Sequence, residues 1–456
     1  MTQKEALDIL KLGYNVYLTG AAGTGKTYVL SEYISYLRAK GIGVGITAST
    51  GIAATRLNGI TLNSWAGIGI REDLSLKEIK NLKRRRYLLR RFYLAKVLII
   101  DEATMLSAAT LDLVDRTCKV FKDSSLPFGG MQVVLAGDFF QLPPVVTDGR
   151  KTELIYKSKS WQDLTLKFCY LAREYRQTDP ELLHILEEIR EQRVSQESIK
   201  TLASRIHKPL SVATKLYTHN ANVTFINDAA LAILPGKTHS YRMEGKGLPH
   251  LVDALKKNCL VSEILHLKVG TLVMCLKNNF QKGYVNGSLG AVVGFSSKGY
   301  PVVELLNEKR ITITPVEWIT EEDGQVIAKV RQIPLQLAWA ITIHKSQGLS
   351  LDAAKIDLGR TFLPGMGYVA LSRVRSLSGI SLLGLNQKAL QVDERALQFD
   401  QRLREQSEAV RKKLDSLTLL QKQKQQSDFR VKLRGNTYTK KSSIRQTEKR
   451  ELLYLN

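Results

Sequence analysis

The stretch Gly20-Ala21-Ala22-Gly23-Thr24-Gly25-Lys26-Thr27 reads G-x-x-x-x-G-K-T, the pattern of a phosphate-binding loop. An apolar run typical of a buried strand, residues 15–19, precedes it, and residues 28–38 carry apolar side chains at helical spacing. Glycines let such a backbone curl until several N–H groups point at one anion, and the following helix N-terminus adds positive charge. We therefore predict that the whole stretch binds nucleotide phosphates, with Lys26 reaching the β- and γ-phosphates and Thr27 ligating Mg²⁺.

A second apolar run, residues 96–100, ends in two adjacent carboxylates, Asp101 and Glu102. Parallel sheets place their chemistry at the carboxyl ends of strands, so we expect these side chains near the phosphate loop. Asp101 is predicted to hold Mg²⁺, and Glu102 to polarise an attacking water. Together with the loop, this pair predicts hydrolysis of ATP.

A third apolar strand, residues 131–136, leads to Gly137-Asp138-Phe139-Phe140-Gln141. We expect the end of this strand beside the γ-phosphate, where Gln141 can hydrogen-bond to phosphate or water and report whether hydrolysis has occurred. Gln3 stands ahead of the phosphate loop, where a side-chain amide can pair with adenine. An ordinary surface glutamine is the alternative interpretation of Gln3.

Residues 44–54 read as a strand that ends in small hydroxyl residues and opens a helix. Ser49, Thr50 and the following N–H groups, that of Gly51 among them, can hold a DNA phosphate. An ordinary turn with a threonine cap explains the same residues, and taken alone it is the better explanation.

The α/β pattern returns in a buried strand at residues 335–343. Polar residues crowd its end, which favours contact with phosphate: Thr342, His344, Lys345 and Ser346. Residues 367–373 then read as a helix that presents Arg373. An arginine brought from a second lobe can neutralise charge that develops on the γ-phosphate.

Lysine and arginine outnumber aspartate and glutamate by 67 to 43, which gives a formal net charge of +24. This excess is larger than ATP requires and indicates a polyanionic partner, first of all nucleic acid. The densest cluster mixes cations with aromatic rings: Lys83, Arg84, Arg85, Arg86, Tyr87, Arg90, Arg91, Phe92 and Tyr93. Such a segment can meet phosphates and bases, and a solvated basic helix is the alternative.

The length of 456 residues predicts about three domains. We expect a first α/β lobe at 1–150 with an insertion at about 66–95, and a second at 151–240 and 332–390. Short β runs with Asn-Gly and Lys-Gly turns predict a small β-barrel at 241–331. The basic tail, 391–456, is predicted to form a helix at 396–420 and then to be largely disordered or ordered only on nucleic acid.

Four cysteines, Cys118, Cys169, Cys259 and Cys275, show neither a C-x-x-C pair nor zinc-ligand spacing. They are expected to be buried thiols in a reducing compartment. The polar N-terminus lacks a signal core, and no apolar run is long enough to span a bilayer. These features predict a soluble, intracellular, cytoplasmic protein.

Eight stretches stand in the order found in PIF-one-type DNA helicases, of the RecD-like branch of superfamily one. They are GAAGTGKT, TASTGIAA, TLNSWAGIG, LIIDEATML, PFGGMQVVLAGDFFQLPPV, YRQTDP, LAWAITIHKSQGLSLD and YVALSRVRSL. The resemblance covers nearly everything from Gln3 to about Phe399. The segment from Pro127 to Val145 and LAWAITIHKSQG are its most specific parts.

The resemblance implies an α/β fold of two RecA-like P-loop lobes with ATP between them. It implies a small wedge insertion in lobe one and a small Src-homology-type β-barrel in lobe two. It further implies an ATP-dependent DNA helicase that moves 5′ to 3′ on single-stranded DNA and unwinds forked duplexes. DNA repair, recombination or replication would be its setting, and the protein is expected to be monomeric in solution.

By the same resemblance, the catalytic set is Lys26, Asp101, Glu102, Gln141, Arg176 and Arg373, and Gln3 reads adenine. The residues that resemble DNA-backbone contacts are Thr50, Gly51, Ser64, Trp65, Thr342, His344, Lys345 and Ser346. Three positions depart from the usual pattern, because Asn63, Phe92 and Met366 stand where the family has His, Trp and Gln. These departures put rate and coupling in doubt more than activity.

Two other functional classes are compatible with a phosphate loop. A P-loop ATPase that remodels proteins would hydrolyse ATP without stimulation by DNA. A DNA-binding subunit with a decayed ATP site would not keep Lys26, Thr27, Asp101, Glu102 and Arg373 together. The helicase is therefore the leading prediction.

Overall fold

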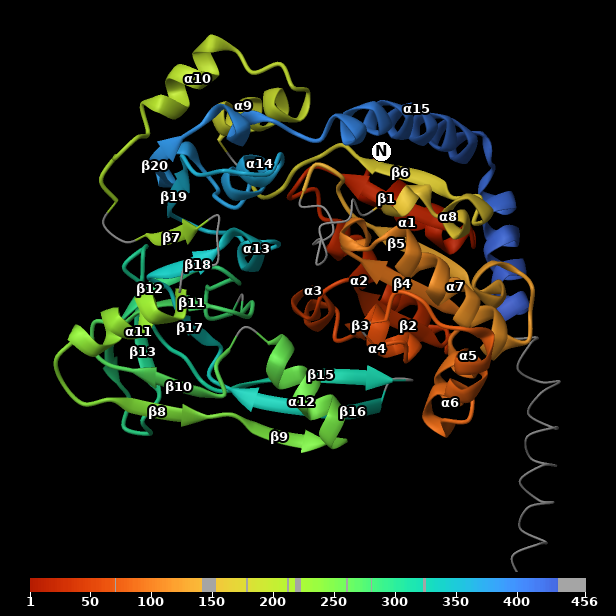
Figure 1. Ribbon diagram of the computed structural model, residues 1–456, viewed down its shortest axis with the longest axis horizontal. Coiled ribbons are helices and arrows are strands. Elements are labelled where there is room, and N and C mark those ends of the chain that lie inside the picture. The colour runs from red at the N-terminus through yellow and green to blue at the C-terminus, as the bar shows by residue number, and fades with distance from the viewer. Residues whose placement is uncertain are drawn as a thin grey trace, which may run out of the picture.

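Two parallel sheets, one in each half of the chain, organise the fold (Figure 1). The computed structural model describes residues 1–69, 71–141, 153–177, 179–210, 213–217, 223–259, 261–279, 281–322 and 325–433. The first sheet has six strands in the order β3-β2-β4-β5-β1-β6, all parallel. The second has four parallel strands in the order β18-β7-β19-β20. The predicted α/β fold with two lobes is therefore confirmed.

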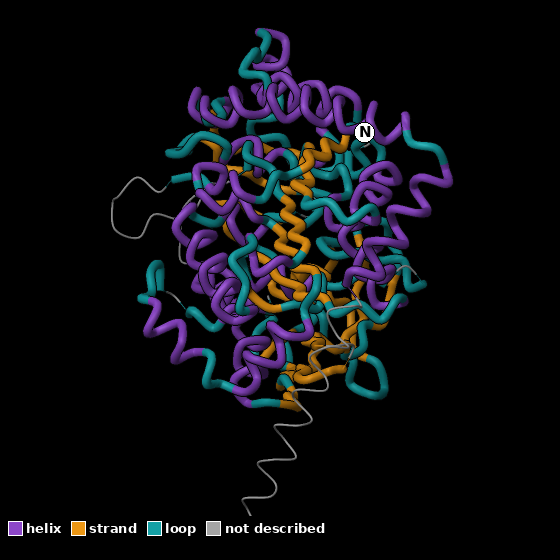
Figure 2. The backbone as a smooth tube through the Cα atoms, turned by 90° about the vertical axis from the view of Figure 1, so that its right-hand side faces the viewer, coloured by secondary structure: helices purple, strands orange, loops and turns teal. Residues whose placement is uncertain are grey.

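Lobe one is a sheet covered by helices on both sides, which Figure 2 shows as a central column of strands. Its strands are apolar enough to be buried on both faces, as parallel strands usually are. They are β1 (Val16–Gly20), β2 (Val44–Ala48), β3 (Ile60–Thr61), β4 (Val97–Asp101), β5 (Gln132–Ala136) and β6 (Lys167–Leu171). The helices are α1 (Gln3–Lys11), α2 (Lys26–Ala39), α3 (Gly51–Arg56), α4 (Leu62–Ala66), α5 (Leu76–Leu82), α6 (Arg86–Leu94), α7 (Ala108–Lys122) and α8 (Lys159–Asp163), with 3-10 turns η1 (Ala103–Met105), η2 (Pro127–Gly130) and η3 (Ile155–Lys157).

The boundary predicted at residue 150 is too early. Strand β6 pairs with β1 along its whole length, from Val16 opposite Lys167 to Gly20 opposite Leu171. Helix α8 packs on α7 beside it. Lobe one therefore extends to Leu171, because its sheet recruits an edge strand from beyond the third apolar strand.

Lobe two follows with a smaller sheet. Its strands are β7 (Thr214–Tyr217), β18 (Ala340–Thr342), β19 (Ala354–Leu358) and β20 (Ile380–Leu385). Its helices are α9 (Pro180–Arg190), α10 (Gln196–Ala203), α11 (Val223–Ile233), α13 (Ile343–Ser346) and α14 (Met366–Leu371), with 3-10 turns η4 (Leu377–Gly379) and η5 (Gln387–Leu390). Met366, one of the departures from the family pattern, is fully buried in the core of this lobe.

A β-rich insertion separates β7 from β18 and lies at the lower left of Figure 1. Its elements are β8 (His239–Arg242), β9 (Glu244–Gly247), α12 (Pro249–Asn258), β10 (Ile264–Leu267), β11 (Leu272–Cys275), β12 (Leu289–Phe295), β13 (Pro301–Leu305), β14 (Arg310–Thr312), β15 (Val316–Glu322), β16 (Gln325–Gln332) and β17 (Leu335–Leu337). They form antiparallel sheets ordered β14-β13-β12-β11-β17, β15-β16-β9 and β10-β8. A β-rich insertion is present, and its closure into one barrel stays a prediction.

The basic segment 83–93 is less exposed than its composition suggested. Helix α6 buries Leu88, Arg91 and Phe92, and the Phe92 ring stacks on Phe121 with centroids 4.2 Å apart. Arg91 donates to the carbonyl of Trp65 at 3.0 Å. Two residues of this segment, Arg91 and Phe92, are therefore part of the lobe-one core and do not face DNA as expected. The spacing i, i+3, i+4 of the buried residues explains why.

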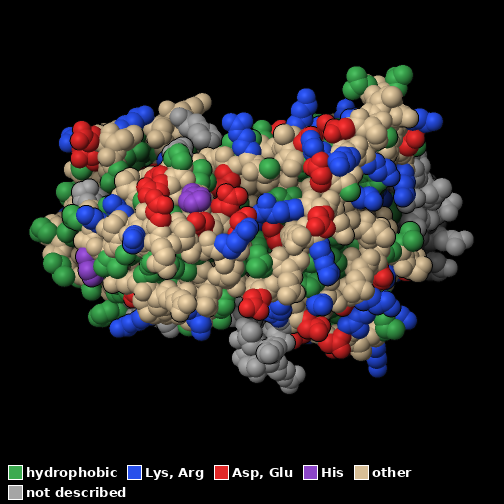
Figure 3. All heavy atoms as spheres, turned by 90° about the horizontal axis from the view of Figure 1, so that it is seen from above, with side chains coloured by type: hydrophobic (Ala, Val, Ile, Leu, Met, Phe, Trp, Pro, Cys, Tyr) green, Lys and Arg blue, Asp and Glu red, His purple; other side chains and the backbone are tan. Residues whose placement is uncertain are grey.

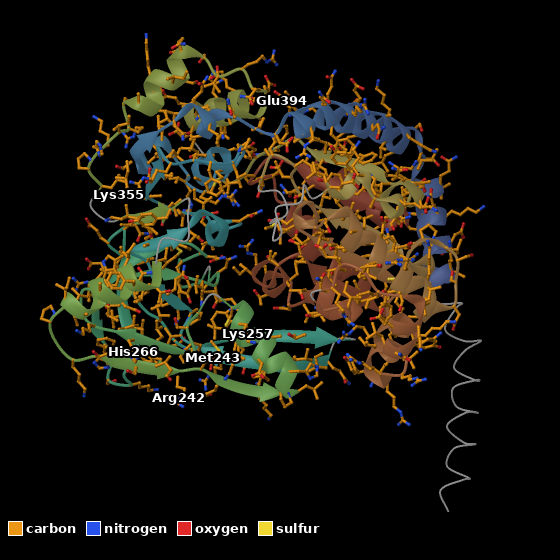
Figure 4. All side chains as sticks on the ribbon, in the orientation of Figure 1. Arg242, Met243, Lys257, His266, Lys355 and Glu394 are labelled. Carbon is orange, nitrogen blue, oxygen red and sulfur yellow. The ribbon has the colours of Figure 1, made fainter. Side chains whose placement is uncertain are left out.

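A long C-terminal helix, α15 (Glu394–Ser416), returns from lobe two to lobe one. Figure 1 shows it crossing above β6, and Figure 4 labels Glu394 at its start. Residues 419–433 form a further helix, and Phe429 and Leu433 pack on the core of lobe one. The expectation of disorder after residue 421 is wrong as far as 433, because these apolar residues find a partner surface. Residues 434–456 lie outside the described residues.

Candidate active site and nucleic-acid surface

A cavity of about 880 Å³ lies between the lobes, beside the phosphate loop. Its lining includes five residues of lobe one: Gly23, Lys26, Thr27, Glu102 and Gln141. Two arginines from beyond β6, Arg176 and Arg373, line it as well. These side chains come from positions up to hundreds of residues apart. The cavity therefore brings together five of the six residues of the predicted catalytic set, and Asp101 lies directly behind it.

Lys26 begins α2, and its ammonium group reaches back over the loop. It donates to the carbonyls of Gly20 and Ala21, at 2.8 and 3.0 Å. Burial lowers the pKa of Lys26, whereas the charges of Asp138 and Glu102 oppose that shift. Gly25 has φ +83°, a left-handed conformation that glycine adopts without strain. The loop is thus shaped for an anion, with one cation held at its centre.

The Gln3 side chain lies against the same loop and donates to the Thr24 carbonyl at 3.0 Å. A Cβ atom added to Gly25 would collide with this amide, so a residue larger than glycine would displace Gln3. Tyr28 and Tyr175 line the cavity mouth and are half exposed. Gln3 is therefore placed at the phosphate loop, and its adenine contact stays a prediction.

Thr27, Asp101 and Glu102 form the acidic end of the cavity. The Thr27 hydroxyl donates to Asp101 Oδ2 at 3.2 Å, and the backbone N–H of Glu102 donates to Asp101 Oδ1 at 2.9 Å. Burial, and then the neighbouring charge of Glu102, raises the pKa of Asp101 to about 6. Glu102 itself adopts φ +50°, which turns its side chain away from that of Asp101 and towards the cavity.

The oxygens of Thr27 and Asp101 suit Mg²⁺, which prefers hard oxygen ligands and keeps several waters and phosphate oxygens in its shell. Within the described residues, no group of three or more His, Cys, Asp or Glu side chains is placed to hold a metal ion. A Mg²⁺ ion held by these two side chains, with waters and nucleotide phosphates as its other ligands, is consistent with both observations.

Arg176 and Arg373 approach the phosphate loop from the other side. Arg176 donates to the Ser372 carbonyl at 3.2 Å, and Arg373 donates to the Val369 carbonyl at 2.9 Å. Burial, followed by repulsion from neighbouring arginines, lowers the pKa of Arg176 to about 10 and that of Arg373 to about 9. Both guanidinium groups stay protonated at neutral pH, and no carboxylate among the described residues forms an ion pair with either.

A buried ion-pair network behind Gln141 was not anticipated from the sequence. Asp138 accepts two hydrogen bonds from Arg190, at 3.0 and 2.9 Å, and one from the Gln141 amide at 3.2 Å. Arg190 also donates to the hydroxyl of Tyr368, which in turn accepts the Ala22 N–H of the phosphate loop at 3.0 Å. Although burial would raise the pKa of Asp138, the charge of Arg190 holds it below its ordinary value.

The network joins the lobes, because Arg190 ends α9 of lobe two while Asp138 follows β5 of lobe one. A signal for it existed in the sequence: Arg190 stands four residues after Leu186, on the apolar stripe of α9. A charged residue on a buried stripe needs a buried partner, but its identity depends on the tertiary fold.

Two further residues enter the site without prediction. Gln347 follows α13, is 7% exposed, and donates to Gln141 Oε1 at 3.1 Å and to Glu102 Oε2 at 3.4 Å. Arg56 ends α3 and donates to the Gln347 carbonyl at 2.6 Å. Gln347 lay inside the motif HKSQG, where only its neighbours were given a role.

The predicted DNA contacts of lobe one divide into exposed and buried residues. Thr50 and Gly51 open α3 at a half-buried position, where the Thr50 hydroxyl caps the helix by accepting the Ala53 N–H. Ser64 is exposed. Trp65, by contrast, is 3% exposed and packs against Phe92, so a direct contact of its ring with DNA is not supported.

The predicted contacts of lobe two also need a correction. Ser346 is fully buried, and its hydroxyl donates to the Ile343 carbonyl at 2.7 Å, so its side chain does not face a ligand. Thr342 is 6% exposed. The side chains of His344 and Lys345 lie outside what the structure describes.

Charged side chains of both signs lie on the molecular surface. Lysine, arginine and acidic side chains are interspersed over the face seen from above in Figure 3. No helix among the described residues is long and apolar enough to cross a bilayer. The four cysteines are buried free thiols, as predicted.

Comparison with known proteins agrees with this geometry. Residues 2–198 match the PIF1-like helicase family, and residues 250–295 match the 2B domain of DNA helicase Pif1. The ATP-dependent DNA helicase Pif1 of Psychrobacter sp. (strain PRwf-1) is 42% identical over 455 residues, which cover 86% of this chain and 69% of that protein. The chain spans 69%, 62% and 61% of the lengths of the first three curated relatives.

Two solved structures show the same fold. Pif1 from Bacteroides sp. in complex with ADP-AlF4 superposes with a TM-score of 0.76 and 31% identity over 88% of this chain and 96% of that one. Pif1 helicase from Bacteroides in complex with ADP-AlF3 and single-stranded DNA superposes with a TM-score of 0.60 and 30% identity over the same shares.

Proposed function

This chain belongs to the PIF1-like helicase family and is an ATP-dependent DNA helicase, and from that premise we propose how its residues divide the work. ATP binds in the cavity between the lobes, and its hydrolysis drives 5′-to-3′ movement along single-stranded DNA. The observation that carries this proposal is the convergence of Lys26 and Glu102 of lobe one with Arg176 and Arg373 on one cavity.

Binding of the triphosphate begins at the loop. Lys26 exchanges the carbonyls of Gly20 and Ala21 for the β- and γ-phosphates, while the loop N–H groups hold the remaining oxygens. Gln3 reads the adenine edge. Thr27 and Asp101 would hold Mg²⁺, which when bound neutralises phosphate charge and fixes its geometry.

Hydrolysis depends on both lobes. The Glu102 carboxylate takes a proton from the attacking water, and Gln141 contacts the γ-phosphate and registers its loss. Arg176 and Arg373 neutralise the charge that develops on the transferring phosphoryl group, which an unpaired guanidinium does best in a site with little water. Because these arginines come from beyond β6, the reaction requires a closed cavity.

Single-stranded DNA is the proposed partner on the surface above the cavity. Support comes from the exposed Ser64, from the N-terminus of α3 with Thr50 and Gly51, and from the net charge of +24. A Bacteroides relative of the same fold is bound to single-stranded DNA. The exposed arginines of the α5–α6 segment, Arg84 and its neighbours, would meet the duplex at a fork.

The coarser organisation is proposed in the same way. We assign residues 1–171 to lobe one, 172–238 and 338–393 to lobe two, and 239–337 to the β-rich insertion. A monomer acting in DNA repair, recombination or replication is consistent with these assignments. The soluble, cytoplasmic setting predicted from the sequence stays a proposal.

The experiment that tests the proposed function is strand separation on forked DNA that carries either a 5′ or a 3′ single-stranded tail. We expect ATP-dependent unwinding of the 5′-tailed fork only, and ATP hydrolysis that single-stranded DNA stimulates. Unwinding of the 3′-tailed fork alone would reverse the polarity. Hydrolysis indifferent to DNA would point instead to an ATPase that remodels proteins.

A further inference from the structure

Gln347 lies beside the cavity, where its side-chain amide joins lobe two to two groups of lobe one. Its amide nitrogen donates to Gln141 Oε1 at 3.1 Å and to Glu102 Oε2 at 3.4 Å. It is 7% exposed, so these contacts are made away from bulk solvent. The two residues that it joins are those to which we assign water activation and γ-phosphate contact.

The direction of these hydrogen bonds is fixed from both ends. The Gln141 amide nitrogen donates to the Asp138 carboxylate, which Arg190 keeps ionised, so Gln141 must offer its oxygen to Gln347. Glu102 at the other end is also an acceptor. Gln347 therefore presents its NH₂ group to both neighbours, and its carbonyl oxygen, Oε1, is left over.

That oxygen is buried and has no hydrogen-bond partner among the described residues. A buried acceptor without a donor costs free energy comparable to a lost hydrogen bond, so such an atom usually marks a place for a missing group. The two side chains that the Gln347 amide contacts, Gln141 and Glu102, are acceptors, and Arg56 donates to the backbone carbonyl instead. Water or a ligand N–H or O–H is therefore the complement for Oε1. At a site built for ATP hydrolysis, the attacking water is that donor.

We propose that Gln347 is a catalytic residue whose Oε1 accepts a hydrogen bond from the attacking water, and this proposal rests on the helicase function assigned above. The water oxygen attacks the γ-phosphorus while one of its protons passes to the Glu102 carboxylate. Its other O–H bond points at Gln347 Oε1. The bond from the γ-phosphorus to its bridging oxygen breaks, ADP leaves with that electron pair, and inorganic phosphate remains.

Arg56 is the residue that sets this geometry. Its guanidinium donates to the Gln347 backbone carbonyl at 2.6 Å, and it fills the space beside Gly348 so closely that a Cβ atom there would collide with it. Figure 1 shows α3, which ends at Arg56, next to α13, which precedes Gln347. Because α3 belongs to lobe one, the water acceptor from lobe two is in place only while the lobes are closed.

The test compares full-length Gln347→Ala and Gln347→Met with the wild type and with Gln196→Ala, an exposed glutamine on α10. The measurements are DNA-stimulated kcat and KM for ATP, and the affinities for ADP and for ADP with aluminium fluoride. Aluminium fluoride recruits the attacking water, whereas ADP does not. The wild-type rate with and without DNA tests the proposed function separately.

We expect both Gln347 variants to lose about 10² in kcat, the cost of misplacing a reacting group, with KM nearly unchanged. Affinity for ADP with aluminium fluoride should fall at least about tenfold, the scale of one net hydrogen bond, while ADP affinity stays within about twofold. Equal losses of both affinities would mean that Gln347 only shapes the nucleotide site, and a wild-type kcat would remove it from the reaction. Either outcome overturns the inference without touching the helicase assignment.

Discussion

The two sides of the nucleotide cavity are held in different ways. On the lobe-one side, the functional groups contact one another: Lys26 binds the loop carbonyls and Thr27 binds Asp101. On the lobe-two side, Arg176 donates to the Ser372 carbonyl and Arg373 to that of Val369. Both line the cavity without an ion pair to a described carboxylate. The first arrangement can bind a nucleotide alone, whereas the second becomes useful only when a phosphate supplies the missing negative charge.

This contrast predicts that lobe one determines the affinity for ATP, whereas lobe two determines the rate of ATP hydrolysis. In the cavity, the cations outnumber the carboxylates until ATP arrives, which favours closure around the triphosphate and opening after phosphate release.

The largest effect is expected from Arg373→Ala. Removing an arginine finger costs about 10³ or more in turnover, because transition-state charge is left uncompensated. DNA affinity in the absence of nucleotide should change little. The measurements are single-turnover ATP hydrolysis and oligonucleotide binding, with the exposed Arg360→Ala as the matched control. A collapse of DNA affinity with hydrolysis intact would move Arg373 to the DNA surface.

The ion pair between the lobes offers a second test, of stability rather than turnover. Arg190 is 4% exposed and pairs with Asp138 at 2.9 Å and with Asp400 of α15 at 3.6 Å. Arg190→Met should destabilise the protein by about 3–5 kcal/mol, because the buried Asp138 loses its counter-charge, whereas Asp400 keeps its ion pair with Arg404. The comparison in denaturant unfolding is Arg193→Met, whose side chain is 76% exposed. If both variants unfold alike, Arg190 does not hold the lobes together.

A smaller effect on turnover should follow from Glu102→Gln. Loss of a general base costs about 10² or more in turnover. The isosteric amide can still accept the hydrogen bond from Gln347 through its carbonyl oxygen, but it cannot take a proton from water. ATP binding should survive, because Lys26 and the loop are untouched. Glu197→Gln on the exposed face of α10 is the control. Hydrolysis at the wild-type rate would remove Glu102 from water activation.

The sequence predicted the lobes and most of the site because their signals are local. The phosphate loop and the Asp101-Glu102 pair each stand at the end of an apolar strand, and parallel sheets bring such ends together. Arg373 follows an apolar helix that the sequence also predicted. The Arg190–Asp138 ion pair was not predicted, because 52 positions separate the two residues and the sequence around neither indicates its partner. Gln347 escaped because its role depends on which acceptors the other lobe presents.

The burial of side chains in the basic run follows helical periodicity and not composition. Arg91 and Phe92 belong to the dense basic run, yet with Leu88 they occupy the i, i+3, i+4 stripe that a helix turns towards the core. The edge strand β6 was assigned to the wrong lobe, because the apolar pattern of a strand does not indicate which sheet the strand joins. Phe429 likewise shows that a sparse apolar residue in a basic tail can still find a core.

The smallest expected effect concerns what is left of the basic run. Arg84 and Arg85 are exposed between α5 and α6, and the exposed Arg86 begins α6. Lys83, by contrast, already pairs with Asp123. Replacing the three arginines by alanine should impair unwinding of a fork more than movement on single strands. Each phosphate contact releases counterions when DNA binds. Every contact that the substitutions remove should therefore lower the slope of the salt dependence of duplex binding by about 0.9.

The measurements are fork unwinding, translocation on a single strand, and fork binding across a salt series. The matched control replaces Arg402, Lys412 and Lys413, exposed cations on α15, which change net charge equally at another place. Both triple variants lower the long-range attraction to DNA alike, so only the first should lose unwinding selectively. Equal losses of fork unwinding in the two variants would mean that the three arginines act only through net charge. Strand separation would then be assigned to the nucleotide cavity alone, without a wedge.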